Sequence, residues 1–224
     1  MPYFPGVYFL FRVDALFLIF FYEVILLRDE LELLLKLGDS EEVDPSIDLS
    51  SIFSNDSPVE LEIGIGKGRF LIDSAARCPS INFIGVEWAM KYLRIAHDRS
   101  LRKGQHNVRF VRADAREFVE FFLKTNSIST YHIYFPDPWP KKRHHKRRLI
   151  DSDFVIEIER TLCSGGMLRL ATDHKEYFSV MVDVFGTSTI LEPVDAEWDG
   201  VRTNYEEKYM AQGKSIYRRI YRHL

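Results

Sequence analysis

Residues 59–70 read V-E-L-E-I-G-I-G-K-G-R-F, an apolar run that passes directly into three alternating glycines and then into a helix-forming segment. Residues 59–63 have the composition of a buried strand. Glycine lets the backbone turn sharply and lets a ligand approach where a Cβ would block it. Gly64, Gly66 and Gly68 therefore predict a ligand-binding turn at the end of the strand. The signal is weak alone, since a tight turn without a ligand has the same composition.

Strand-like and helix-like segments alternate along the rest of the chain, which is typical of βαβ units and a parallel sheet. Further strands are expected at residues 82–86, 108–112, 131–135, 167–171, 189–194 and 215–221. Helices are expected at residues 69–77, 89–103, 115–124, 154–162 and 174–185. The sequence thus predicts an α/β fold, in which ligands bind beyond the carboxyl ends of the strands.

The length and composition indicate one domain with a substantial core, which we place at residues 48–224 of the 224-residue chain. Two cysteines, Cys78 and Cys163, cannot form a disulfide framework and indicate a reducing, cytoplasmic compartment. No metal site is expected, because neither cysteine has a second ligand at a suitable spacing.

Residues 1–47 form an atypical apolar extension and acidic linker. We expect an apolar helix that ends near residues 37–38, with the polar linker running on to Pro58. Arg12, Asp14 and Glu23 interrupt the apolar run, and its longest charge-free piece near the centre is residues 15–22. That piece is too short to span a bilayer, which takes about 20 residues, so no membrane partner is expected. A start site placed too far upstream is an alternative explanation of this segment.

Acidic residues lie at three predicted strand ends: Glu62 before the glycines, Glu87 after the second strand and Asp114 after the third. Glu62 can pair with a cationic ammonium group. Glu87 can accept hydrogen bonds from ribose hydroxyls, and Asp114 can accept one from an adenine amino group. A ligand with these three parts and no phosphate fits S-adenosylmethionine, whereas the phosphates of a dinucleotide would meet Glu62. Helix capping explains Glu87 or Asp114 singly, but explains the three acids together poorly.

The segment 131–148 reads Y-H-I-Y-F-P-D-P-W-P-K-K-R-H-H-K-R-R. Its three prolines predict a stiff loop that fixes the directions of Asp137 and Trp139 just beyond a strand. A basic block follows in a chain of formal charge −3, which indicates a local surface for a polyanion. A solvated charged loop is the alternative for the block alone. The residues of this block that are expected to contact the polyanion are Lys142, Arg143, Lys146 and Arg147.

Taken together, these motifs resemble the tRNA (guanine-N7)-methyltransferase family of the bacterial single-chain type. The resemblance rests on residues 61–70, 85–88, 114–115, 135–148, 172–173 and 203–206 and covers the chain from about Asp48 onward. It implies a Rossmann-like fold of the S-adenosylmethionine-dependent methyltransferases, with a mostly parallel seven-stranded sheet and helices on both faces. The implied substrate is a guanine in the variable loop of tRNA, and the protein is expected to act as a monomer or homodimer.

The resemblance also implies roles for individual residues. The cofactor positions are Glu62, Gly64, Gly66, Gly68, Glu87, Asp114, Ala115 and Asp137, and Asp137 is the implied catalytic residue. The substrate nucleotide is expected to contact Lys141, Asp173, Thr203, Asn204, Tyr205 and Glu206.

Guanine N7 carries a lone pair and no proton, so the reaction needs alignment rather than a general base. Asp137 would then favour the shift of positive charge to the base while it holds guanine or the cofactor. Asp173 can accept from the N–H edge of guanine or cap the following helix, and Trp139 either stacks on a base or anchors its loop. Two other functions stay open: methylation of another RNA or a small molecule, and RNA binding with a decayed cofactor pocket.

Overall fold

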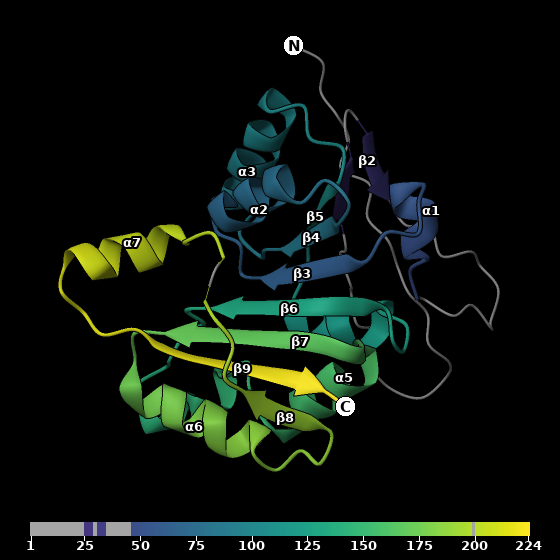
Figure 1. The fold of residues 1–224 in the computed structure, drawn as a ribbon. Coiled ribbons are helices and arrows are strands. Elements are labelled where there is room, and N and C mark those ends of the chain that lie inside the picture. The colour runs from purple at the N-terminus through teal and green to yellow at the C-terminus, as the bar shows by residue number, and fades with distance from the viewer. Residues whose placement is uncertain (1–24, 29–30, 35–45, 199) are drawn as a thin grey trace.

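A computed structural model describes residues 25–28, 31–34, 46–198 and 200–224. Within these residues nine strands form one sheet in the order β2-β1-β5-β4-β3-β6-β7-β9-β8 (Figure 1). The strands are β1 (Ile25–Arg28), β2 (Leu31–Leu34), β3 (Val59–Ile63), β4 (Asn82–Val86), β5 (Val108–Arg112), β6 (Ile128–Tyr134), β7 (Leu162–Thr172), β8 (Leu191–Val194) and β9 (Tyr217–His223). The α-helices are α1 (Leu49–Phe53), α2 (Arg69–Arg77), α3 (Met90–Arg102), α4 (Ala115–Glu117), α5 (Ser152–Thr161), α6 (Lys175–Phe185) and α7 (Asn204–Ala211).

Strands β3 to β9 confirm the predicted seven-stranded, mostly parallel sheet. β5, β4, β3, β6 and β7 pair in parallel, and β9 is antiparallel to both β7 and β8. The chain proceeds outward from β3 to β5 and then returns to β6 on the other side of β3. The carboxyl ends of β3 and β6 therefore flank the point where the strand order reverses, which is where open α/β sheets bind ligands.

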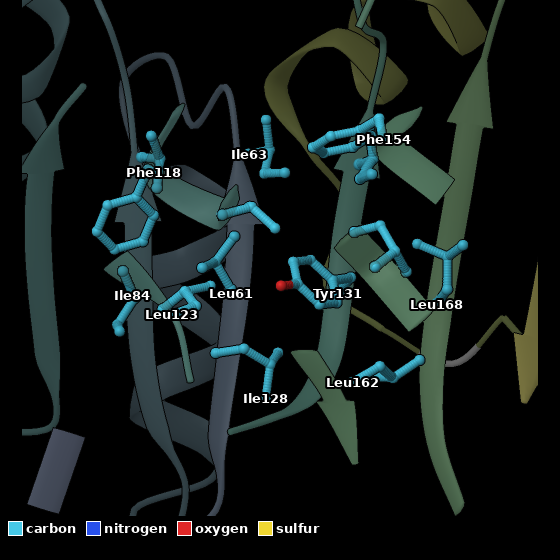
Figure 2. Close-up of a cluster of buried hydrophobic side chains, with 14 of the residues drawn as sticks. Leu61, Ile63, Ile84, Phe118, Leu123, Ile128, Tyr131, Phe154, Leu162 and Leu168 are labelled. Carbon is cyan, nitrogen blue, oxygen red and sulfur yellow. The ribbon is translucent and has the colours of Figure 1, made fainter. Parts of the chain in front are cut away.

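Strands β3 and β6 each have one apolar and one polar face, because successive side chains of a strand point to opposite sides. Leu61, Ile63, Tyr131 and Ile133 are buried in a large core cluster with side chains of α5 and α6 (Figure 2). A second cluster lies between α2, α3 and strands β4 and β5. Burying one such Leu or Ile side chain contributes about 1.5–3 kcal/mol. The two core clusters thereby fix the positions of β3 and β6, including their polar face.

The expected amino-terminal helix and linker are wrong where they can be compared with the structure. Residues 25–28 and 31–34 form an antiparallel pair of strands, with β1 against β5, instead of a helix. The other residues of the expected helix and the first part of the expected linker lie outside the described residues. Residues 46–58 are not a linker, since Asp48 caps α1 through the amides of Ser50 and Ser51, and Ile52 and Phe53 join the core.

Three other elements differ from the expectation. The helix expected at residues 115–124 divides into α4 and a π-helix, η1 (Phe118–Phe122). β7 begins at Leu162, five residues before the expected start, and its pairing with β6 shifts register between Ile128 and Thr130. Helix α7 forms where no helix was expected, and the side chain of Thr203 caps it by accepting a hydrogen bond from the Glu206 amide.

Substituting Gly68 by alanine is expected to destabilise the fold through the contact of the glycine turn with α3. Gly68 has a φ of +69°, and an added Cβ would lie 2.6 Å from the Cβ of Ala96. Gly213 has a φ of +67° and open space around it, so Gly213→Ala is the matched control for backbone strain. In urea unfolding we expect a loss of about 1–2 kcal/mol for the control and a further 1–3 kcal/mol for Gly68→Ala. Equal losses would contradict a close turn–helix contact.

Candidate active site

A cavity of about 340 Å³ opens at the carboxyl ends of β3 and β6. It joins the glycine turn to Tyr134 and Phe135 at the end of β6 and to the first turn of α7. Its wall consists of Glu62, Gly64, Ile65, Gly66, Lys67, Arg69, Phe70, Tyr92, Arg99, Tyr134, Phe135, Thr203, Asn204, Tyr205 and Lys208. The glycine turn and the start of the proline loop thus share one cavity.

All three glycines of the turn adopt a left-handed conformation. Gly64 and Gly66 have φ values of +74° and +54°, and an added Cβ at either would meet nothing within 4 Å. The Gly64 amide donates to the carbonyl of Val86 at 2.8 Å, which fixes the turn against β4. The two glycines therefore leave an open wall that a ligand can approach closely.

Glu62 points from β3 into this cavity and is almost completely buried. Its Oε2 atom has no hydrogen-bond partner within the described part of the chain. Burial is the main reason that the pKa of Glu62 is raised to about 8; a backbone hydrogen bond at Leu71 opposes the rise, and the nearby carboxylate of Glu87 adds to it. A buried carboxyl group with one unpartnered oxygen is costly, and a cationic ligand group would satisfy that oxygen.

Glu87 and Asp114 lie at the ends of their strands as predicted, and both contact backbone amides. Glu87 accepts from the amide of Gly66 at 2.9 Å and from that of Ala89 at 2.8 Å, so it supports the glycine turn. Asp114 caps α4, accepting from the Arg116 amide at 2.9 Å, and Ala115 is the first residue of that helix. Neither carboxylate belongs to the wall of the cavity, so their predicted contacts with ribose and adenine remain predictions.

A buried hydrogen-bond chain crosses the polar face beneath the cavity. His132 bonds through Nε2 to Glu60 and through Nδ1 to the hydroxyl of Tyr134, each at 2.7 Å. Burial lowers the pKa of His132 against the opposing effect of Glu60, which favours a neutral ring. Phe70 packs on both rings, with centroids 4.7 Å from His132 and 4.9 Å from Tyr134. Sequence reasoning missed this chain: E-L-E in β3 and H-I-Y in β6 each show a polar residue at every second position, but neither segment specifies the register that brings Glu60 to His132.

The proline loop after β6 is held rigidly. Phe135 and Trp139 have φ values of +53° and +42°, which non-glycine residues rarely adopt. The Phe135 amide donates to the Ala171 carbonyl at 2.7 Å, and the buried Arg148 donates to the Pro138 carbonyl at 2.8 Å. Asp137 is exposed at the tip of the loop, outside the cavity wall.

The aromatic and basic residues that follow the loop form one surface. Trp139 is half-buried, and the guanidinium of Arg147 lies 5.0 Å from its ring centroid. Residues 142–147 form a 3-10 helix, η2 (Lys142–Arg147), and the five exposed cations of this surface are Lys141, Lys142, Arg143, Lys146 and Arg147. Arg148 differs from them, because it is buried over the ring of Tyr177 and fixes the loop to α6.

Apart from the exposed Lys141, the implied substrate residues either line the cavity or form ion pairs. Asn204 and Tyr205 line the cavity, and Thr203 lines it while capping α7. Glu206 is buried and paired with Arg218, so its carboxylate supports α7. Asp173 lies 3.1 Å from the Lys214 ammonium, and His174 rather than Asp173 caps α6. The helix-cap alternative for Asp173 is therefore wrong.

The described residues contain neither a metal-binding cluster nor a membrane-spanning helix. No group of three or more His, Cys, Asp and Glu side chains there has the arrangement of a metal site. No helix in the described ranges has the length and apolar character that crossing a bilayer requires.

Comparison with known proteins agrees with this architecture. A family model described as "Putative methyltransferase" matches residues 56–219. The tRNA (guanine-N(7)-)-methyltransferase of Geobacillus kaustophilus is 37% identical over 174 residues, which cover 75% of this chain and 80% of that protein. The protein of the same name from Listeria monocytogenes serotype 4b is 38% identical over 174 residues, covering 75% and 81%.

The solved structure of the aminoglycoside resistance methyltransferase NpmB1 has the same fold, with a TM-score of 0.57 at 19% identity. The match covers 90% of this chain and all of that one. Fold and cavity together define the class: a Rossmann-like methyltransferase whose cofactor is S-adenosylmethionine. Within that class, the chain belongs to the tRNA (guanine-N7)-methyltransferase family.

Glu62→Gln is expected to stabilise the cofactor-free protein and to weaken its binding of S-adenosylmethionine. The pKa of Glu62 is about 8 in the folded state against an ordinary value of 4.5, so the folded state holds an extra proton between these values. The free energy of unfolding of the wild type therefore falls as pH rises from about 5 to about 8, an effect that glutamine lacks.

The measurement is thermal unfolding across this pH interval, combined with titration calorimetry of cofactor binding. The advantage of the variant in Tm should widen with pH, while cofactor affinity drops roughly tenfold or more through loss of a charged pair. Glu192→Gln alters an exposed glutamate of β8 and should change neither quantity. Parallel pH profiles of stability for wild type and Glu62→Gln would refute the buried-acid explanation.

Proposed function

We propose that this protein transfers the methyl group of S-adenosylmethionine to N7 of a guanine in the variable loop of tRNA. The observation that carries the proposal is the single cavity joining buried Glu62 and the glycine turn to Phe135, at the base of the proline loop. The names of the relatives support tRNA guanine as the substrate. We further propose that residues 48–224 form the catalytic domain, acting as a monomer or homodimer in the cytoplasm.

The residues around the glycine turn fit the cofactor by charge and by space. Glu62 would hold the ammonium group, which supplies the partner that Oε2 lacks. Gly64 and Gly66 leave room for close approach of the ligand. Glu87 accepts hydrogen bonds from two backbone amides and still has lone pairs that can accept hydrogen bonds from the ribose hydroxyls. Asp114 and Ala115 would contact the adenine. Once bound, S-adenosylmethionine supplies an electrophilic methyl group on a sulfonium.

On the substrate side, the protein's task is to hold guanine N7 in line with that methyl group. No residue has to remove a proton, because N7 attacks with a lone pair. Correct alignment can lower the barrier by about 7–11 kcal/mol, provided that the residues holding the base are rigid. Asp137, Asp173, Asn204 and Tyr205 would hold the base. The fixed carboxylate of Asp137 would also favour the positive charge that the methylated ring gains.

The direct test is methyl transfer from labelled cofactor to bulk unmodified tRNA, beside a panel of other RNAs and small molecules. Mapping the modified nucleotide should place it at a variable-loop guanine. Transfer to another RNA or to a small molecule in preference to tRNA would overturn the proposal. Cofactor binding without transfer to any acceptor would favour a binding module instead.

Asp137→Ala is expected to reduce kcat by about two to three orders of magnitude while the Kd for S-adenosylmethionine changes little. Cofactor affinity should change little because Asp137 lies at the loop tip, outside the wall of the cofactor cavity. The measurements are single-turnover methylation and calorimetric cofactor binding. Asp56→Ala, which alters an exposed aspartate before β3, is the control. Equal losses in turnover and cofactor binding would assign Asp137 to cofactor holding alone.

Neutralising η2 should weaken tRNA binding and flatten its dependence on salt. The four residues Lys142, Arg143, Lys146 and Arg147 are exposed, and each phosphate contact contributes about 0.9 to the slope of log K against log salt. In a variant with glutamine at all four positions, the magnitude of this slope should therefore be smaller by roughly three to four. Filter binding of tRNA at several salt concentrations measures this. An unchanged slope would show that η2 does not dock RNA.

A further inference from the structure

A second hollow, of about 390 Å³, lies between α2, α3 and the start of α7. Its lining is Arg69, Ile72, Asp73, Arg99, Arg102, Lys103 and Asn204. Three of these residues, Arg69, Arg99 and Asn204, also line the cofactor cavity, so the hollow extends from the site already described. Four cationic side chains surround it against one carboxylate, in a chain whose formal charge is −3.

Carboxylates compensate only part of this positive charge. Asp73 lies 2.6 Å from the Lys103 ammonium and 3.8 Å from Nε of Arg69, and Glu207 of α7 makes a two-pronged contact with Arg69. Arg99 donates to the Lys67 carbonyl at 3.1 Å, which leaves its charge unbalanced. Arg102 is exposed and has no polar partner among the described residues. Four cations against two carboxylates leave an excess of two positive charges.

A simpler explanation is that Arg99 and Arg102 serve the helix dipole, since both lie in the last turn of α3. Helix α2 offers a direct comparison, because Arg77 is an exposed arginine in its last turn and lies outside the hollow. The dipole explanation applies equally to Arg77 and Arg102. It does not explain why unbalanced cations surround a hollow that continues into the cofactor cavity.

We propose that this hollow binds a phosphate of the tRNA backbone next to the target guanine, an inference that rests on the proposed function. Helices α2 and α3, which line the hollow, pack beside β4 and β5, whereas α6 packs beside β7 (Figure 1). η2 is tied to α6 through Arg148. The two basic surfaces therefore flank the cavity from opposite sides. An RNA backbone that contacts both would place the nucleotide between them over the cofactor, and the Arg guanidinium matches the geometry of a phosphate group.

Charge reversal at Arg102, with Arg77 as the matched control, tests this inference. Arg102→Glu should raise the Kd for tRNA about tenfold and lower the salt slope by about one. Arg77→Glu should leave both within twofold, although the helix-dipole contribution predicts the same small loss of Tm in the two variants. Affinity for S-adenosylmethionine should stay unchanged in both. Equal effects of the two substitutions on tRNA binding would overturn the proposal.

Asp73→Asn tests the same site with the opposite sign. It removes the carboxylate that balances Lys103, so we expect tighter tRNA binding and a steeper dependence of binding on salt. Unchanged or weaker binding would contradict phosphate binding in the hollow. A wild type that neither binds nor methylates tRNA would overturn the proposed function and this inference together. Normal wild-type methylation with no response to Arg102→Glu or Asp73→Asn would overturn this inference alone.

Discussion

The buried carboxyl group of Glu62 is the constraint on which the site depends. Burying a carboxylate with an unpartnered oxygen costs free energy, and the raised pKa of Glu62 reflects this unfavourable burial of the charged form. The cost is offset on the other side of the same strand, where Leu61 and Ile63 are buried in the main core cluster. Because successive residues of a strand face opposite ways, the apolar face of β3 fixes the register that directs Glu62 into the cavity.

The neighbouring groups keep that register from relaxing. Glu87 accepts hydrogen bonds from the Gly66 amide in the turn and from the Ala89 amide before α3, so this second acid stabilises the shape of the cavity before any ligand is bound. Gly68 contacts Ala96 so closely that α3 determines where the turn can lie. The free protein thus maintains an open, acidic wall, which reduces the ordering that ligand binding would otherwise require.

Features carried by neighbouring residues were predictable from the sequence, and features made by distant residues were not. Strands β3, β4 and β5 have the predicted bounds, because each is a short apolar run beside glycine or a polar turn. The chain Glu60–His132–Tyr134 depends on the pairing of β3 with β6, which no local pattern specifies. Helix α7 was missed although Thr203 and Glu206 have capping spacing, since its stability also depends on Arg69 and Arg218 elsewhere in the chain.

The proline loop shows why a reaction without a general base still needs a demanding structure. When catalysis consists of alignment, a displacement of about 1 Å can cost as much as losing a catalytic group. Two non-glycine residues of this loop hold left-handed conformations, a strain that persists only where the surroundings enforce it. Here the buried Arg148 and the carbonyl of Ala171 enforce it from two sides. Arg148, although it belongs to the basic run in sequence, thus contributes rigidity to the loop, and its exposed neighbours contribute charge at the surface.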